Sequence, residues 1–420
     1  MDQALPIAFN RRERLTQILS EPRLISVLFL GFASGLPLLL TGSTLQAWYA
    51  MSNVNIVTIG LLTLVGQPYV YKFVWAPLLD RYSLPWLGRR RGWMFLLQIL
   101  LVVGIAVMGL LQPNNEPLGL AFIALIVAFL SASQDISIDA YRTDILQPDE
   151  RGLGAGLFTM GYRVAMLTGG ALVLVMADHI GWKLTYWFMA FLMVLQLVVT
   201  YFSKPPVDDV APPHNLMQAI LDPFREFFKH KYAVSILVFI VIYKLGDVFT
   251  LILGTTFLIR GVGFSLTDIG LMYKLVGMLG IFIGVLAGGI WMKKITLLRA
   301  LVVFGIIQTL VNLPFMFLAM SGKNYLLLIV TVFVENFGSG LGSVAFLAFL
   351  MSLCDHRYTA THFALFSALA AIGRVFVGPI AGVMVEHLGW VHYFFWAFLL
   401  GFPGVIMLSW LKRHSLFKTA

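Results

Sequence analysis

Long apolar runs separated by short polar segments recur along the whole 420-residue chain. A run of roughly 20 apolar residues is long enough to cross the hydrocarbon core of a bilayer as an α-helix. Barrel strands do not fit, because they are about ten residues long and alternate apolar with polar positions. The sequence therefore predicts an all-α integral membrane protein whose spans each satisfy their own backbone hydrogen bonds. We expect twelve spans, near 24–49, 55–79, 93–111, 118–141, 152–176, 184–202, 233–259, 267–291, 297–319, 324–353, 361–384 and 391–411.

Composition agrees with a membrane protein. Charged residues make up 12% of the chain and hydrophobic residues 59%, whereas a soluble domain carries about 25% charged residues. The single cysteine, Cys354, excludes an internal disulfide bond.

The net charge of +9 would suit a nucleic-acid partner if it covered one surface, but it is divided by topology instead. With the N-terminus inside, the cytoplasmic segments carry 21 Lys and Arg residues. The external loops carry three, which are Lys183, Arg260 and Lys323. An inside excess of this size orients a multi-pass protein with both termini cytoplasmic. We therefore expect a lipid bilayer around the chain and no nucleic-acid partner.

Two stretches about 210 residues apart share one pattern. GSTLQAWYAMSNVNIVTIGLLTLVG begins at Gly42, and GTTFLIRGVGFSLTDIGLMYKLVG begins at Gly254. A second echo pairs DHIGW at 178–182 with EHLGW at 386–390, and each precedes the last span of its half. A six-span unit repeated in the same orientation resembles the parallel repeat of the major facilitator fold. We expect that fold, with two parallel six-helix halves.

The join between the halves carries four prolines within residues 205–213, which is typical of a linker. The expected organisation is a cytoplasmic N-terminal segment at 1–23, six-helix halves at 24–202 and 232–411, a cytoplasmic linker at 203–231 and a cytoplasmic tail at 412–420.

The loop between the second and third spans reads APLLDRYSLPWLGRRRGW. It resembles the Asp-Arg…Arg signature that major facilitators carry at this loop, which latches the cytoplasmic side during transport. Arginines at this position also enforce topology, and we expect both roles. The gating candidates in this loop are Asp80, Arg81, Arg89, Arg90 and Arg91.

Topology does not explain the ionisable residues that lie within spans. On insertion scales each Lys, Arg or Asp at the bilayer centre costs roughly 2.5–3.5 kcal/mol, so such residues face the bundle interior or a wet cavity and usually pair. Nine residues fall in this class: Lys72, Asp135, Asp139, Arg163, Lys244, Asp247, Lys274, Glu335 and Arg374.

Lys244 and Asp247 lie three residues apart in VIYKLGDVFT, so they share one helix face. One interpretation is a self-neutralising pair that lets the helix pack. The other is a substrate-binding cation beside a proton-coupling acid at the midplane, where transporters hold their substrates. We favour the second interpretation because a purely structural pair is replaceable by apolar residues.

Glu335 lies about halfway along the tenth span and has no cation within one helical turn. Low dielectric disfavours the charged form of such a carboxyl group, which makes Glu335 a proton-coupling candidate. The alternative is permanent pairing with a cation from another span, such as Arg374 or Lys274.

Asp135 and Asp139 share a face of the fourth span at spacing i, i+4. Asp139 lies near the cytoplasmic end, one turn before Arg142, so we expect these two residues to form part of a gate. Asp135 lies deeper, next to Gln134. It is a further proton-coupling candidate, and Gln134 is a substrate-binding candidate.

Arg163 and Arg374 occupy the fifth and eleventh spans, which the repeat relates. A guanidinium group in a cavity binds carboxylates through two parallel hydrogen bonds. These arginines are therefore candidates for binding an anionic substrate, unless they pair with Asp135, Asp247 or Glu335. Further substrate-binding candidates in the spans are Lys274, Tyr162 and Tyr243.

No enzyme or ATP-binding motif is present. The sequence lacks a Gly-x-x-x-x-Gly-Lys run and the His-Glu-x-x-His, Cys-x-x-Cys and Gly-x-Ser-x-Gly patterns. We therefore expect no enzymatic activity, no metal and no cofactor. Two other classes of protein are less well supported. A non-transporting sensor has no need of nine intramembrane charges, and a membrane-embedded enzyme needs a catalytic cluster.

Several long blocks closely resemble the AmpG muropeptide permeases of Gram-negative bacteria. They include LGFASGLPLLLTGSTLQAWY, SASQDISIDAYRTD and ALFSALAAIGRVFVGPIAG, and the likeness covers residues from about 20 to 410. The resemblance implies a multi-pass transporter of the bacterial inner membrane. It would import GlcNAc-1,6-anhydroMurNAc and its peptides by proton symport, for cell-wall recycling and β-lactamase induction.

From the same resemblance we expect a monomer whose partners are the muropeptide substrate and the proton. The alternative within transporters is a carrier of another anionic solute, such as an acyl-coenzyme A.

Overall fold

The computed structural model describes residues 21–146, 151–205, 228, 232–292, 294–353 and 359–413. Most of the expected linker, nearly all of the N-terminal segment and most of the C-terminal tail lie outside these residues. Throughout the described ranges the regular structure is helical, without a strand. The all-α prediction is confirmed.

The first half of the chain forms helices joined by short turns. They are α2 (Pro22–Thr41), α3 (Ser43–Met51), α4 (Ile56–Leu61), the 3₁₀ segment η1 (Leu62–Gly66), α5 (Gln67–Tyr71), the 3₁₀ segment η2 (Lys72–Val74), α6 (Ala76–Arg81), α7 (Gly88–Met108), α8 (Pro117–Ile145), α9 (Arg151–Leu167), the π segment η3 (Thr168–Leu172), α10 (Val173–Ile180) and α11 (Trp182–Phe202).

The second half repeats this plan. Its helices are α13 (Ala233–Tyr243), α14 (Leu245–Ile252), α15 (Gly254–Thr256), the π segment η4 (Phe257–Val262), α16 (Leu266–Asp268), the π segment η5 (Ile269–Leu275), α17 (Val276–Met292), α18 (Leu297–Leu310), α19 (Leu313–Ser321), α20 (Tyr325–Ser352), α21 (Thr359–Leu399) and α22 (Phe402–Arg413).

Among the described residues, ten helical stretches are long and apolar enough to cross a membrane. The count differs from twelve at two places. The second expected span is broken into short pieces, of which Ile56–Tyr71 is the apolar part, because prolines in the first turns of α5 and α6 remove backbone donors. The last two expected spans fall in one stretch, Ala368–Trp410, which Gly389 interrupts with φ 72° and ψ 171°. The number twelve stays a prediction.

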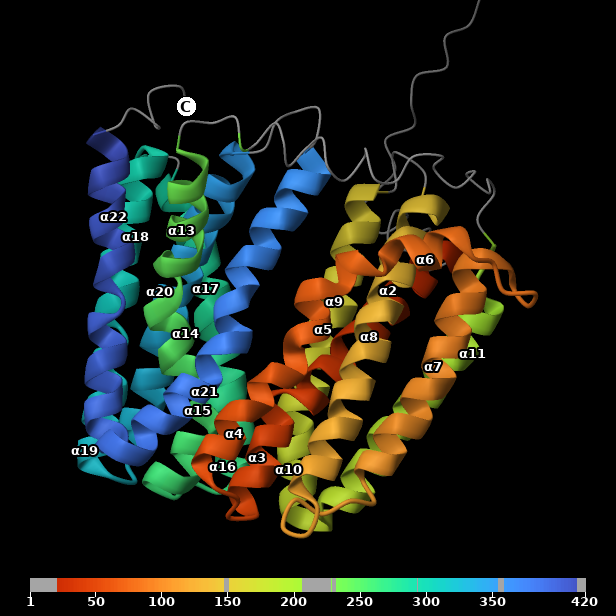
Figure 1. The fold of residues 1–420 in the computed structure, drawn as a ribbon, viewed down its shortest axis with the longest axis horizontal. Helices are drawn as coiled ribbons and strands as arrows, with labels where there is room; N and C mark the ends of the chain where they lie inside the picture. Colours follow the sequence, from red (N-terminus) through yellow and green to blue (C-terminus); the bar gives the residue numbers. More distant parts are fainter. Residues whose placement is uncertain are drawn as a thin grey trace, which may run out of the picture.

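The two halves form two groups of helices that meet at one end and separate toward the other (Figure 1). Helix α22, which ends at Arg413, ends at the separated end, and α3, α4, α15 and α16 lie at the end where the groups meet. We call these the separated end and the joined end. If both termini are cytoplasmic, the joined end faces outside.

Side-chain packing explains this shape. One large hydrophobic core contains residues of both halves, such as Trp48 and Tyr186 of the first and Phe257 and Phe394 of the second. Two smaller cores lie toward the separated end, and each belongs to one half alone. Apolar burial therefore joins the halves at one end only.

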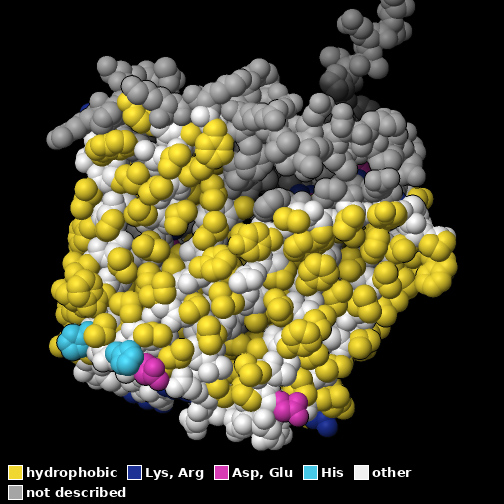
Figure 2. Space-filling view, viewed as in Figure 1, with side chains coloured by type: hydrophobic (Ala, Val, Ile, Leu, Met, Phe, Trp, Pro, Cys, Tyr) yellow, Lys and Arg dark blue, Asp and Glu magenta, His cyan; other side chains and the backbone are white. Residues whose placement is uncertain are grey.

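The outer surface suits a bilayer. Figure 2 shows a face that is hydrophobic over most of its height, and the ionisable side chains visible on it lie chiefly at its lower edge. Many large apolar side chains are exposed to the surroundings, including Phe122, Leu286 and Ile406. Such a surface is expected where lipid replaces water as the solvent.

Helices α2 and α9 pack with almost no side chain between them. A Cβ atom added to Gly161 would collide with the carbonyl oxygen of Leu28, and one added to Gly31 would collide with that of Phe158. Small residues allow this close approach, which is a common source of stability between membrane helices.

We predict that Gly161→Val lowers the free energy of unfolding by about 1–3 kcal/mol, or prevents folding, because the new side chain forces the two helices apart. Gly289→Val is the matched control, since a Cβ atom at Gly289 meets nothing within 4 Å. Thermal unfolding of both variants in detergent measures the difference. Equal stability of the two variants would contradict this packing.

Candidate functional site

A pocket of about 600 Å³ lies between the two halves. Helices α2, α3 and α9 of the first half and α21 of the second contribute to its wall. Among the described residues, the wall holds two arginines and a tyrosine but no carboxylate. Its lining residues are Leu38, Leu39, Gly42, Ser43, Phe158, Thr159, Tyr162, Arg163, Met166 and Arg374.

Arg163 and Arg374 face this pocket from opposite halves. The Arg163 guanidinium lies over the ring of Phe282 in α17, with 5.6 Å to the ring centroid. Its Nη1 is 4.0 Å from the sulfur of Met166. Neither arginine forms a salt bridge within the part of the chain that the structure describes, and Arg374 is exposed. Pairing with Asp135, Asp247 or Glu335, the alternative weighed from the sequence, is not found there.

Lys274 adds a third cation beside the pocket. It lies in the π segment η5, and its Nζ donates to Ser43 Oγ at 3.2 Å and to Thr255 Oγ1 at 3.5 Å. Ser43 lines the pocket and belongs to the other half of the chain. The ammonium group is therefore held by two hydroxyl groups, one from each half.

Lys244 and Asp247 form a salt bridge with 3.7 Å between Nζ and Oδ2, as the first interpretation of their spacing has it. Their roles in substrate binding and proton coupling stay predictions. Their side chains are 15% and 11% exposed. Lys244 lies at the break between α13 and α14, and its Nζ also donates to Ser343 Oγ at 3.1 Å. Ser339 donates to Asp247 Oδ2 at 3.1 Å. Two serines of α20 thus hold the pair against that helix.

Glu335 lies one helical turn before Ser339 and is fully buried. Its Oε2 accepts a hydrogen bond of 2.7 Å from Asn336 Nδ2, whereas its Oε1 has no hydrogen-bond partner. No cation bridges Glu335 among the described residues. The charges that act on it are those of Asp247 and Lys244, and pairing with Arg374 or Lys274 is not found there.

Asp135 accepts a hydrogen bond of 2.6 Å from Ser34 Oγ, which joins α8 to α2. Lys72 is the opposite charge that acts on it. Gln134 is buried beside it and donates to the Ala33 carbonyl at 2.9 Å. Gln134 therefore ties two helices together and does not line the pocket.

Tyr162 lines the pocket, as its sequence neighbourhood predicted. Tyr243 does not line it, because it lies in the core of the second half. Its ring stacks on Phe346 with 5.4 Å between centroids, and its hydroxyl donates to the Leu301 carbonyl at 2.9 Å.

The gating candidates lie at the separated end. Asp139 pairs with Arg142 at 3.2 Å, and Arg142 also lies over the ring of Phe158. Arg90 Nε bonds Asp144 Oδ2 at 3.0 Å, and Arg91 Nη2 donates to the Tyr201 carbonyl at 2.5 Å. The Asp139–Arg142 pair lies within α8, whereas the other three contacts join different helices of the first half.

Arg89 begins α7 beside Arg90 and Arg91, as expected. The side chains of Asp80 and Arg81 lie outside what the structure describes, so their gating role stays a prediction.

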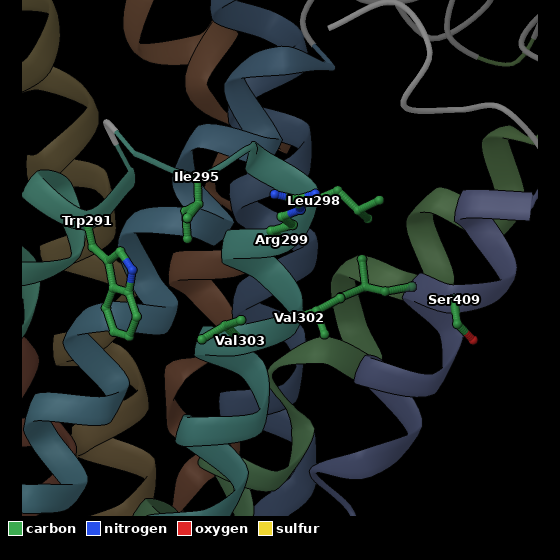
Figure 3. A pocket seen from close by; sticks show the side chains of 8 residues that line it. Trp291, Ile295, Leu298, Arg299, Val302, Val303 and Ser409 are labelled. Carbon is green, nitrogen blue, oxygen red and sulfur yellow. The ribbon is translucent and has the colours of Figure 1, made fainter.

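A second pocket, of about 410 Å³, lies on the second half alone, between α17, α18 and α22 (Figure 3). Trp291 and Arg299 lie on its wall. It contains none of the candidate residues and no residue of the first half, so it cannot serve as a path between the halves.

Two helical halves around a pocket that both halves line define a membrane carrier of the major facilitator type. The comparisons agree: a family model described as Major Facilitator Superfamily matches residues 24–376. Among solved structures, a nucleoside transporter, NupG, aligns with a TM-score of 0.71 at 15% identity, over 91% of this chain and 98% of that one.

Sequence relatives narrow the family. An Escherichia coli K12 protein named anhydromuropeptide permease is 47% identical over 393 residues, which is 93% of this chain and 80% of that protein. A Rickettsia felis protein that carries the name AmpG 4 is 30% identical over 409 residues, 95% of this chain and 99% of its own length. The chain belongs to the AmpG family of the major facilitator superfamily.

We predict that Lys244→Met destabilises the protein by about 3–5 kcal/mol, because it leaves the Asp247 carboxylate buried without its cation. Adding Asp247→Asn should restore much of that loss, and thermal unfolding of the two single variants and the double variant measures the coupling.

Lys323→Met is the matched control, since the bridge from Lys323 to Asp268 is 3.9 Å long with the lysine 43% exposed. Its effect should stay near zero. Additive losses from Lys244→Met and Asp247→Asn would show that the two residues do not act as a pair.

Proposed function

We propose that this protein imports GlcNAc-1,6-anhydroMurNAc and its peptides across the bacterial inner membrane by proton symport. It works as a monomer with both termini cytoplasmic. The observation that carries the proposal is the pocket between the halves, whose wall holds Arg163 and Arg374 and, in the part of the chain that the structure describes, no acid. The 47% identity to a protein named anhydromuropeptide permease supports the choice of substrate.

The pocket suits such a substrate chemically. A muropeptide carries carboxylates on its peptide and hydroxyl groups on its sugars. A guanidinium group binds a carboxylate through two parallel charge-assisted hydrogen bonds. Arg163 comes from the first half and Arg374 from the second, so one carboxylate between them connects the two halves. Tyr162 and Ser43 offer hydroxyl groups to the sugars.

Among the three acids considered for the proton, Glu335 is best suited. Its side chain is fully buried, and Oε1 has no hydrogen-bond partner. Asp247 Oδ1 also has no hydrogen-bond partner, but its Oδ2 is held by Lys244 and Ser339, and Asp135 is held by Ser34. A buried carboxyl group without a cation changes its proton occupancy when its surroundings change. The charges of Lys244 and Asp247 act on the Glu335 carboxyl group. Because Lys244 lies at the break between α13 and α14, a change in the charge of Glu335 acts on that break.

The arrangement of the halves supports an alternating cycle. With the joined end outside, the pocket lies between halves that separate toward the cytoplasmic side. Import then requires a second state in which the joined end opens and the separated end closes. Each proton that moves down a potential of 100 mV yields about 2.3 kcal/mol, which drives accumulation of an anionic solute.

The test is uptake of labelled GlcNAc-anhydroMurNAc-tripeptide by proteoliposomes, with and without an imposed proton gradient. The expected result is accumulation that an uncoupler abolishes. Uptake that only equilibrates would overturn symport and leave the substrate in place. Absence of uptake by folded protein would overturn the substrate.

We predict that Glu335→Gln abolishes accumulation against a gradient while exchange of labelled for unlabelled substrate continues, because the amide fills the same space but carries no proton. Glu116→Gln in the exposed external loop is the matched control. Accumulation by Glu335→Gln with an unchanged pH dependence would assign the proton to another residue.

We further predict that Arg163→Ala and Arg374→Ala each raise the KM for uptake by about tenfold or more, since each removes a charge-assisted hydrogen bond to the substrate. Arg299 lies on the wall of the second pocket, away from the two halves' shared pocket, so Arg299→Ala should leave KM unchanged. An unchanged KM in both pocket variants would remove this pocket from the binding site.

A further inference from the structure

The two echoes DHIGW and EHLGW lie at the joined end, and the proposed transport chemistry makes no use of them. In each echo the glycine has a positive φ, 80° at Gly181 and 72° at Gly389. This conformation ends or interrupts the helix at little steric cost. The acid three residues earlier, Asp178 or Glu386, is therefore held in the last turn before the break.

Each of these acids crosses to the other half. Asp178 Oδ2 accepts hydrogen bonds from the backbone N of Thr267 at 3.1 Å and from its Oγ1 at 2.6 Å. Thr267 lies in the first turn of the helical stretch Leu266–Met292. Glu386 Oε1 accepts a hydrogen bond of 3.0 Å from Asn55 Nδ2.

The two contacts are related by the sequence repeat. Asn55 is the N-cap residue of α4, and its own Oδ1 accepts from Val57 N at 2.7 Å. Span five of the first half thus holds the start of span eight of the second. Span eleven of the second half holds the start of span two of the first. Both carboxylates lie at helix N-termini, where the partial charge is positive.

A cation, Arg260, makes a third contact between the halves at this end. Arg260 of η4 donates to the carbonyl oxygens of Ala50 at 2.9 Å and Tyr49 at 3.1 Å, at the C-terminal end of α3. A cation at a helix C-terminus is favoured for the same reason that an anion is favoured at an N-terminus.

We propose that Asp178, Glu386 and Arg260 form a latch that sets the equilibrium between the closed and open forms of the joined end. They are positioning residues, because they bind the opposite half and not the substrate. Their cross-half contacts exist only while the halves meet at this end, so they stabilise one conformation and not the other. A group that binds one state only shifts the population of the two states.

The test measures access to the pocket from each side of the membrane, without substrate. Leu38 lines the pocket, and Leu38→Cys in a Cys354→Ser background reports access through the labelling rate with an impermeant maleimide. The reagent is applied to right-side-out and to inside-out vesicles. The variants are Asp178→Ala, Glu386→Ala and the double variant, with Glu116→Ala as the matched control.

Each single variant should raise labelling from the joined side about threefold, since exposed charge contacts of this kind are individually weak. The double variant should raise it about tenfold, because independent contacts multiply in population. Labelling from the separated side should fall in parallel, and Asp178→Glu should restore the original rates. Glu116→Ala should match the parent on both sides.

Unchanged labelling of the double variant on both sides overturns the latch. A rise on both sides together also overturns it, because general loosening of the fold raises access without a preference. Neither result tests the proposal about the substrate, because the labelling is done without substrate. If the fast side is the one opposite to that expected, the latch stands and the predicted orientation of the termini is wrong.

Discussion

A charge inside a bilayer must find a partner or a wet surface, and the arrangement of this protein follows from how its spans meet that requirement. In the second half, Lys244 and Asp247 neutralise one another against α20. Arg163 and Arg374 line the pocket and Lys274 lies beside it, and none of the three has a carboxylate partner among the described residues. These cations lie between the halves, where we propose that the substrate binds, whereas the Lys244–Asp247 pair lies against α20.

Different interactions hold the helices together at the two ends of the molecule. At the joined end, a common hydrophobic core is rimmed by charged groups at helix termini. At the separated end, each half keeps its own core, and the described contacts of the arginines after the second span stay within the first half. Hydrophobic burial supplies most of the attraction between the halves, and the charged rim adjusts it. A carrier must break such an interface in every cycle, so a rim of weak contacts suits it.

The sequence predicted what short-range patterns encode. Apolar length predicted the spans, spacing predicted the Lys244–Asp247 and Asp139–Arg142 pairs, and the repeat predicted two equivalent halves. The repeat also carries a second signal: in each echo, DHIGW and EHLGW, the acid lies three residues before a glycine. That signal leads to Asp178 and Glu386, but only the assembled halves reveal that both acids reach across.

Other features could not be predicted from the sequence, because they depend on which helices pack against one another. Tyr243 and Gln134 were candidates for substrate contact by proximity to charges, yet both pack between helices. A hydroxyl or amide group in a span satisfies itself on a neighbouring carbonyl as readily as on a substrate. Prolines also break the second span into short pieces, and the last two expected spans fall in one helical stretch that Gly389 interrupts.

The most direct measurement is an electron cryomicroscopy structure of the protein bound to GlcNAc-anhydroMurNAc-tripeptide. We expect a substrate carboxylate between Arg163 and Arg374, within about 3 Å of both guanidinium groups, with the sugars toward Tyr162. Substrate bound elsewhere, with neither arginine in contact, would contradict a binding site shared by the two halves.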